Sequence, residues 1–260
     1  MRRKGIILAG GSGSRLKPIT TVVNKQLLPV YNKPMIYYPL SILLEIGVQD
    51  ILIITNGLDK KLFHRLLGNG ERFGVNIKYK VQPKPNGIAA GYILSEKFLN
   101  GSPSVMILGD NIFYGSSLVK KLKKSFKNKN SSIFTYEVNN PDQYGVYKNF
   151  NGKRIIIEKP KKFVSKDAVV GIYFLDKNAP KLAKKLKYSN RQELEITDLN
   201  NLYLKKKNTR VVKLDKGVAW LDTGSFDGLL NAANFVMTLE KRQGLTLGSF
   251  KGVEIKKTKK

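Results

Sequence analysis

Short apolar runs alternate with segments of helical period along the first half of the chain, and this alternation most constrains the fold. Each run is typical of a strand buried on both faces, whereas the intervening segments place apolar residues about three or four positions apart, as in an amphipathic helix. Strands and helices in this order form a parallel sheet, so we predict an α/β fold with a mainly parallel sheet. The predicted strands are residues 5–9, 50–55, 76–82, 104–108 and 131–137, and the predicted helices are residues 35–46, 58–67, 87–99 and 116–127.

The second half departs from this alternation. Residues 143–175 have the pattern of three short strands with turns at Asn151-Gly152 and Lys159-Pro160. We expect this β-rich insertion to cover one end of the sheet like a lid. The later elements are predicted helices at residues 179–186, 193–203 and 226–241 and predicted strands near residues 210–214 and 218–220, and the chain after residue 243 is rich in lysine without a helical period.

The 260 residues include no cysteine and one histidine, His64. Disulfides, cysteine catalysis, zinc ribbons and histidine-rich metal sites are therefore excluded, and any metal ion must be bound by oxygen. The apolar stretch at residues 6–9 is too short for the core of a signal peptide, and polar residues interrupt residues 34–48 before they reach the roughly 20 residues of a membrane span. We expect a cytoplasmic protein with no membrane partner.

The charge is strongly positive, because 47 Lys and Arg residues face 19 acidic residues and give a formal net charge of +28. A nucleic acid or another polyanion is one possible partner of such a chain. Only nine of the 47 basic residues are arginines, however, although arginines make most of the specific contacts to base edges. The lysine clusters at residues 120–129, 205–207 and 251–260 are scattered along the chain. We therefore expect solvated lysine-rich surfaces and no specific nucleic-acid partner.

The first predicted strand leads into a glycine-rich loop, Gly10-Gly11-Ser12-Gly13-Ser14-Arg15. Loops at this edge of an open α/β sheet bind ligands, and glycines let backbone N–H groups turn towards a phosphate that an arginine can also hold. A dinucleotide fingerprint is excluded because Leu16 stands at its third glycine, and a P-loop is excluded because no Gly-Lys-Ser/Thr closes the loop. A plain tight turn is the alternative to a phosphate site.

Two carboxylates also follow predicted strands, Asp110 after residues 104–108 and Asp222 after residues 218–220. Because the carboxyl ends of the strands meet at one edge of the sheet, we expect both acids there, where they suit magnesium, which takes one or two carboxylates with phosphates and water. Lys25 lies at a polar-to-apolar step that could direct its ammonium group into the same cleft. Taken singly, each acid is also explained as a strand-end turn residue and Lys25 as a surface lysine.

An ordered series of motifs from about residue 3 to residue 244 resembles the sugar nucleotidyltransferase family. These motifs are residues 10–16, 25–39, 81–83, 85–87, 108–111, 144–146, 158–160, 193–198 and 220–224. The resemblance implies a three-layer, Rossmann-like α/β fold with a mixed, mainly parallel sheet and a β-rich sugar-binding insertion. It implies one nucleotidyltransferase domain at residues 1–244, with a nucleotide-binding half at about 1–137 and a sugar-binding half at about 138–244, before a short Lys-rich tail at 245–260.

Within the family, the resemblance is to members that transfer a thymidylyl group from dTTP to α-D-glucose 1-phosphate. It implies a magnesium-assisted attack of the sugar phosphate that gives dTDP-glucose and pyrophosphate, a first step towards dTDP-rhamnose and other deoxysugars. It also implies a homo-oligomer, either a tetramer or a dimer. The alternatives are a uridylyl-, cytidylyl- or adenylyltransferase on the same fold and a basic nucleic-acid-binding protein.

The resemblance also assigns roles to individual residues. The implied catalytic residues are Arg15, Lys25, Asp110, Lys159 and Asp222, with Asp110 and Asp222 as the magnesium ligands. The implied nucleotide-binding residues are Leu8, Gly10, Gly11, Ser12, Gly13, Arg15, Gln82, Pro85, Gly87, Leu108 and Asp110. The implied sugar-phosphate-binding residues are Tyr144, Gly145, Glu158, Lys159, Val169, Tyr173 and Arg191. As alternatives, Asn86-Gly87 is a helix-start turn and Arg191 is a loop arginine paired with Glu193.

Overall fold

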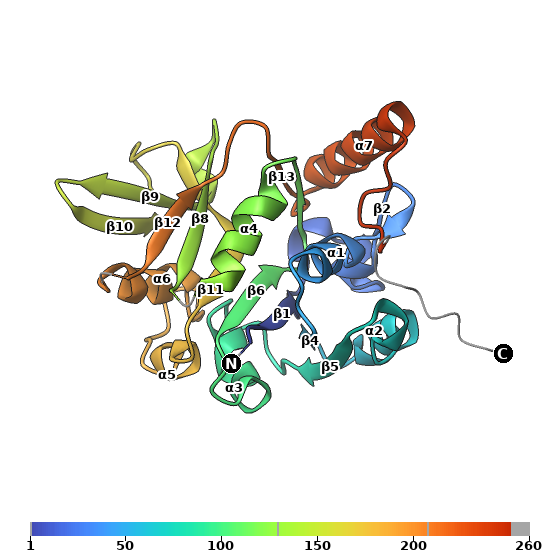
Figure 1. The fold of residues 1–260 in the computed structure, drawn as a ribbon, viewed down its shortest axis with the longest axis horizontal. Helices are drawn as coiled ribbons and strands as arrows, with labels where there is room; N and C mark the ends of the chain where they lie inside the picture. The colour runs from blue at the N-terminus through green and yellow to red at the C-terminus, as the bar shows by residue number, and fades with distance from the viewer. Residues whose placement is uncertain (1, 129, 207, 251–260) are drawn as a thin grey trace.

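The computed structural model describes residues 2–128, 130–206 and 208–250. Its centre is a nine-stranded sheet in which four neighbouring strands run parallel in the order β6, β1, β4, β5 (Figure 1). Their bounds are β1 Lys4–Ala9, β4 Asp50–Thr55, β5 Asn76–Val81 and β6 Ser104–Leu108. The predicted α/β fold with a mixed, mainly parallel sheet is confirmed.

Five later strands join this same sheet. Their bounds are β8 Ser132–Glu137, β9 Gly145–Phe150, β10 Lys153–Glu158, β11 Asp167–Leu175 and β12 Arg210–Lys213. Strand β11 pairs antiparallel with both β6 and β8, and the β9–β10 hairpin joins β11 through the pair Ala168 and Val146. The expectation of a lid is therefore wrong. The insertion lengthens the sheet through these pairings (Figure 1), and the burial of residues 170–175 agrees with the interior position of β11.

The outer edge of β10 is covered by helix α6 (Ile196–Leu204). The side-chain amide of Asn201 accepts a hydrogen bond from the backbone N–H of Ile156 at 2.8 Å and donates one to its carbonyl at 2.9 Å, as a neighbouring strand would. Arg154 donates to the carbonyl oxygens of Leu204 and Thr209 at 2.7 and 2.6 Å. These bonds fasten α6 to the strand that ends at Glu158.

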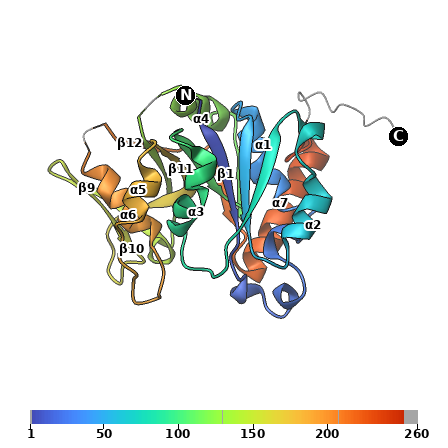
Figure 2. The same cartoon turned by 90° about the horizontal axis from the view of Figure 1, so that it is seen from below.

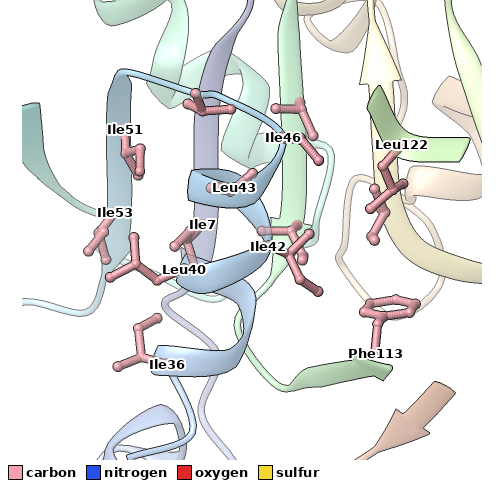
Figure 3. Close-up of a cluster of buried hydrophobic side chains, with 14 of the residues drawn as sticks. Ile7, Ile36, Leu40, Ile42, Leu43, Ile46, Ile51, Ile53, Phe113 and Leu122 are labelled. Atoms are coloured by element: carbon pink, nitrogen blue, oxygen red, sulfur yellow. The ribbon is translucent and has the colours of Figure 1, made fainter. Parts of the chain in front are cut away.

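Helices cover both faces of the sheet and make three layers (Figure 2). One face carries α1 (Tyr37–Glu45), α2 (Lys60–Leu67) and α4 (Leu118–Lys127), and the other carries α3 (Ala90–Leu99), α5 (Ala179–Ala183) and α6. Neighbouring strand residues point to opposite faces, so Ile7 packs under α1 (Figure 3) whereas Ile6 packs under α3. Each such fully buried side chain contributes about 1.5–3 kcal/mol of hydrophobic stabilisation.

A smaller unit packs beside the sheet. It contains the strand pairs β2 (Pro29–Val30) with β3 (Lys33–Pro34) and β7 (Asn111–Tyr114) with β13 (Ala219–Asp222), together with helix α7 (Phe226–Gln243). The sequence did not predict β2, β3 or β7. Short 3-10 helices occupy Ser14–Leu16, Ile19–Thr21, Lys25–Leu27, Glu71–Phe73 and Pro141–Gln143.

After α7 the chain turns at Gly244, and the residues that follow pack against the rest of the fold. Leu247 is buried, and the ring of Phe250 lies 4.5 Å from that of Phe73, measured between centroids. The start of the expected tail, residues 245–250, therefore packs on the fold, and residues 251–260 lie outside the described residues. Within the described ranges, no helix is both long and apolar enough to cross a membrane.

Candidate active site

Two adjoining cavities open at the carboxyl ends of β1, β6 and β13. The smaller, of about 170 Å³, lies against the glycine-rich loop, and the larger, of about 250 Å³, lies against β9, β10, β11 and α6. Arg15 and Asp110 line both cavities, which therefore meet at these two residues. This is the edge of the sheet at which the sequence predicted a ligand site.

The two strand-end carboxylates converge where the cavities meet. Asp110 forms an ion pair with Lys25 through Oδ2 and accepts a hydrogen bond from the side-chain amide of Asn111 through Oδ1 at 3.1 Å. Asp222 lines the larger cavity, and its pKa is raised by burial and then by the negative charge of Asp110, while Lys25 and Arg15 act in the opposite direction. The structure thus brings Asp110, Asp222, Lys25 and Arg15 together, and their catalytic roles stay predictions.

The donor set at this point fits a magnesium ion. Within residues 2–128, 130–206 and 208–250, no group of three or more His, Asp or Glu side chains forms a complete metal cage. Magnesium binds proteins through one or two carboxylates and fills its remaining positions with phosphate oxygens and water. Asp110 and Asp222 would therefore hold it together with a bound phosphate ligand.

The glycine-rich loop is shaped around Gly13 and Arg15. Gly13 has φ +61, its carbonyl accepts a hydrogen bond from Thr20 Oγ1 at 2.8 Å, and an added Cβ would lie 2.9 Å from Thr20 Cγ2. A larger residue there would be strained and crowded. Arg15, near the end of the loop, lies against Gly224. An added Cβ on Gly224 would lie 2.9 Å from Cζ of Arg15 and 3.0 Å from Oδ1 of Asp222. The Arg15 guanidinium and the Asp222 carboxylate therefore flank the same glycine.

Asn24 holds the turn that carries Lys25, and sequence reasoning did not identify it. Its buried side chain accepts a hydrogen bond from the Gln26 N–H at 2.9 Å and caps the 3-10 helix that begins at Lys25. Its amide also donates to the carbonyl of Ala9 at 3.2 Å and to Oδ2 of Asp59 at 2.7 Å. The only local signal for this role is an asparagine directly before the helical turn, a common capping residue.

The predicted sugar-side residues line the larger cavity. These residues are Tyr144, Gly145, Glu158, Lys159, Val169 and Tyr173. Glu158 is oriented by Thr197, whose Oγ1 donates to Glu158 Oε2 at 2.5 Å. The pKa of Tyr173 is raised by burial and by the charges of Glu158 and Asp110. The phenol therefore stays neutral and can both donate and accept hydrogen bonds.

Arg191 lies beside this cavity and is not part of its lining. Its guanidinium contacts both carboxylate oxygens of Glu195, at 2.9 and 3.2 Å, and Oε1 of Glu158 at 3.3 Å. The pairing with Glu193 that was expected as an alternative is wrong, because Glu195 and Glu158 are the acids within reach. A phosphate-binding role for Arg191 stays a prediction.

The predicted nucleotide residues fall into two groups. Gly11, Gly13, Arg15, Leu108 and Asp110 line one or both cavities, whereas Leu8, Gly10, Ser12, Gln82, Pro85 and Gly87 line neither. Gln82 nevertheless lies close to the loop, because an added Cβ on Gly10 would be 2.7 Å from Gln82 Oε1. Gly87 has φ +99, and an added Cβ would lie 2.7 Å from the backbone nitrogen of Leu194. The need for glycine at position 87 therefore comes from packing against Leu194.

Asn111 and Trp220 are also part of the site, although sequence reasoning gave them no role. The buried Asn111 side-chain oxygen accepts hydrogen bonds from Trp220 Nε1 at 2.8 Å and from the Gly171 N–H at 3.2 Å. Since this oxygen faces two donors, the amide NH2 must point towards Asp110. Trp220 also packs on Tyr144, with ring centroids 5.0 Å apart. These contacts join strands distant in sequence, so no local pattern signals them.

Comparison with known proteins places the chain in a family. The family model described as nucleotidyl transferase matches residues 4–238. The glucose-1-phosphate thymidylyltransferase of Xanthomonas campestris pv. campestris (strain B100) is 52% identical over 247 residues, which cover 94% of this chain and 84% of that protein. The protein with the same name from Neisseria meningitidis serogroup A is 50% identical over 245 residues, with coverage of 93% and 85%.

Solved structures share the fold. A crystal structure of a proposed glucose-1-phosphate thymidylyltransferase from Bacillus anthracis in complex with sucrose has a TM-score of 0.81 and 40% identity, covering 90% of this chain and 94% of that one. A UDP-glucose pyrophosphorylase complexed with UDP-glucose has a TM-score of 0.80 at 24% identity, covering 93% and 100%. At that identity the second comparison concerns the fold alone.

Proposed function

The chain belongs to the nucleotidyl transferase family, and we propose that it joins the thymidylyl group of dTTP to α-D-glucose 1-phosphate, giving dTDP-glucose and pyrophosphate. The names of relatives at 50–52% identity support this choice of substrates. The observation that carries the proposal is that Arg15 and Asp110 line both cavities. A triphosphate at the glycine-rich loop and a sugar phosphate beside Glu158 would meet there.

The reaction requires no general base. An oxygen of the sugar phosphate attacks the α-phosphorus of dTTP, a new P–O bond forms, and the bond between the α-phosphorus and the bridging oxygen to the β-phosphorus breaks. A phosphate monoester with a second pKa near 6 is largely dianionic at pH 7, so no proton has to be removed. This agrees with a site of cations and carboxylates, and with His64, the one histidine, being exposed on α2.

The main task of the site is to bring two anions together and to neutralise the charge on the departing pyrophosphate. Arg15 and Lys25 supply positive charge on the glycine-loop side, where both line the smaller cavity. When bound, a magnesium ion held by Asp110 and Asp222 would neutralise charge on the phosphate oxygens. Arg15 and Asp110 line both cavities, and of the two cations Arg15 would hold the α-phosphate in line with the attacking oxygen.

The sugar side is built to bind hydroxyl groups and one phosphate. Glu158 is held by Thr197 and accepts hydrogen bonds from sugar hydroxyls, and the neutral Tyr173 adds a second polar contact. Lys159 follows directly, and its backbone N–H donates to the carbonyl of Tyr144 at 3.0 Å. This bond holds the backbone of the turn, and Lys159, which lines the cavity, would bind the sugar phosphate there.

Other triphosphates are expected to compete to different degrees. Uracil lacks only the methyl group of thymine, a difference worth roughly 1–3 kcal/mol in an apolar pocket, so we expect slow use of UTP. A cytidylyl- or adenylyltransferase is the less supported alternative, since the relatives carry the thymidylyltransferase name. A homo-oligomer, either a tetramer or a dimer, and a cytoplasmic location stay predictions from the sequence.

The test is turnover of dTTP, UTP, CTP and ATP with glucose 1-phosphate and other hexose 1-phosphates, followed by release of pyrophosphate. We expect the highest kcat/KM for dTTP with glucose 1-phosphate, weaker turnover with UTP, and none without a divalent metal ion. Asp222→Asn serves as the inactive control for all substrates. Its side-chain oxygen can still accept the Gly224 N–H bond that Asp222 Oδ1 accepts at 3.0 Å, so the local backbone should be retained. A preference for another triphosphate would assign the enzyme to that nucleotide instead.

A further inference from the structure

The two proposed metal ligands come from segments that are far apart in sequence. Asp110 follows β6, and Asp222 ends β13, which pairs antiparallel with β7 in the register Asp222 with Asn111. In this ladder the next residue pair would be Thr223 and Asp110. The distance between the two carboxylates therefore depends on what joins the backbone at Thr223 to that at Asp110.

Thr223 makes this connection with both its side chain and its backbone. Its Oγ1 donates to the carbonyl oxygen of Asp110 at 2.7 Å, and its N–H donates to the same oxygen at 3.3 Å. The side chain is completely buried, with Oγ1 lying 3.1 Å from the sulfur of Met35. Because one carbonyl oxygen accepts both bonds, the backbone at Asp110 cannot rotate without breaking them.

The need for such a connection follows from charge. Two carboxylates that share a site repel each other, and the repulsion is strongest before a cation lies between them. The ammonium group of Lys25 pairs with Asp110, and among the hydrogen bonds of the described residues the Asp222 carboxylate accepts one from the Gly224 N–H. A bond between the two backbones holds the acids together without using the carboxylate oxygens that a metal ion requires.

We propose that Thr223 is a positioning residue whose hydroxyl group sets the spacing of Asp110 and Asp222 for a divalent cation. This inference rests on the proposed function, because that function makes the two acids the metal ligands. Thr223 itself is buried and lines neither cavity. Removing the hydroxyl therefore weakens cation binding more than it weakens the fold.

Four side chains at position 223 separate the hydroxyl from the methyl group. Thr223→Val keeps the shape and removes the hydroxyl, Thr223→Ser keeps the hydroxyl and removes the methyl, and Thr223→Ala removes both. The hydroxyl is thus tested twice, as threonine against valine and as serine against alanine. If the valine variant fails to fold, the serine and alanine pair still decides the question.

The probe is Mn²⁺ binding to the full-length protein with saturating dTTP, measured from the electron paramagnetic resonance signal of the free ion. We expect the Mn²⁺ dissociation constant to rise about tenfold from threonine to valine and from serine to alanine. This is the lower end of the roughly 10- to 100-fold loss of metal affinity that follows removal of a group supporting a metal ligand. From threonine to serine the dissociation constant should stay within about twofold. Thermal unfolding of the same variants without ligand measures the contribution of packing to stability. In that measurement we expect loss of the methyl group to lower the unfolding temperature more than loss of the hydroxyl group.

Two contrary results have different meanings. If the wild-type protein binds Mn²⁺ with dTTP and the valine variant binds it equally well, Thr223 only fills space, and this inference is wrong while the proposed function stands. If the wild-type protein binds no Mn²⁺ in the presence of dTTP, the metal site of the proposed function is wrong, and the role of Thr223 is overturned with it.

Discussion

The ammonium group of Lys25 forms an ion pair with Oδ2 of Asp110, 85 positions further along the chain. The two side chains are 7% and 24% exposed, so the pair is largely shielded from water. Since Oδ1 of Asp110 accepts the amide of Asn111, both oxygens of this carboxylate are engaged in the ligand-free protein. Lys25 therefore neutralises a charge that a metal ion would otherwise neutralise.

Replacing Lys25 by methionine should destabilise the ligand-free protein and make its stability depend on divalent cations. Breaking a fully buried pair costs about 3–5 kcal/mol, and partial exposure of Asp110 reduces this to about 1–3 kcal/mol. In urea unfolding, we expect added Mg²⁺ to restore more stability to Lys25→Met than to the wild type. Lys33→Met is the control, because Lys33 pairs with Glu240 at 2.8 Å outside the site. Equal responses of the two variants to Mg²⁺ would contradict the prediction.

Asp222→Asn should abolish turnover and at the same time stabilise the metal-free protein at pH 7. Burial and the charge of Asp110 raise the pKa of Asp222, so the folded state binds this proton more tightly than the unfolded state does. The stability that the proton contributes is present below the ordinary aspartate pKa and is lost as pH rises through the raised value. Asparagine has no such loss. Urea unfolding in EDTA from pH 3 to pH 8 should show a gain that disappears at acid pH, and a gain independent of pH would argue against titration of Asp222.

Arg15→Ala should slow the chemical step by about 10²- to 10³-fold, or roughly 2.7–4 kcal/mol, as for loss of a preorganised charge-stabilising donor. The reason is that Arg15 borders both cavities and is flanked by Asp222 across Gly224. Single-turnover rates at saturating dTTP and glucose 1-phosphate measure this step directly. Unchanged rates would reduce Arg15 to a turn residue.

Lys159→Ala should weaken glucose 1-phosphate binding by roughly 1.5–3 kcal/mol and leave dTTP affinity nearly unchanged. Lys159 lines only the larger cavity, and Lys161→Ala, an exposed lysine two positions on, provides the control. We expect Arg191→Ala to act in the same direction, since its guanidinium contacts Glu158. Calorimetric titration with dTTP and kinetics against glucose 1-phosphate separate the two substrates. A large loss of dTTP affinity in Lys159→Ala would mean that Lys159 binds dTTP and not glucose 1-phosphate.

Gly87→Ala should destabilise the fold by at least about 2 kcal/mol, because φ +99 is unfavourable for alanine and its Cβ would meet the backbone of Leu194. Gly57→Ala is the matched control. An added Cβ there would make only an ordinary contact, 3.7 Å from Val81 Cγ1, so its effect should stay within about 0.5 kcal/mol. Urea unfolding of both variants checks the difference, and similar losses would mean that Leu194 moves aside.

The central strands could be predicted because burial on both faces leaves a local signal. Strands β4 and β6 occupy the predicted residues, and helix ends differ by a few residues where the first turn is irregular. Strand β7 was missed because it follows the Asp110 turn directly and its partner is β13, far along the chain. The long apolar run of β11 indicated an interior strand, and the expectation of a lid overlooked it.

The residues on the two sides of the candidate site were predicted from different kinds of evidence. The glycine-rich loop and Asp110 could be inferred from strand ends alone, because the parallel strands β1 and β6 bring their carboxyl ends to one edge. The same rule predicted the position of Asp222, but Asp222 reaches this edge through the antiparallel pairing of β13 with β7. Glu158 and Tyr173 came only from family resemblance, since nothing local distinguishes them. Thr223 and Asn111 act through hydrogen bonds between distant segments, so their roles required the structure.

The bond from Thr223 to Asp110 joins residues 113 positions apart, and this separation has a consequence during protein synthesis. The glycine-rich loop, Lys25 and Asp110 leave the ribosome well before the strand that bears Asp222. A nascent chain halted before that strand possesses the proposed triphosphate side of the site with a single carboxylate. If Asp222 is a metal ligand as proposed, we expect activity on dTTP to arise only once β13 has been translated and has paired with β7, and a premature stop codon before residue 222 to yield a product with no activity.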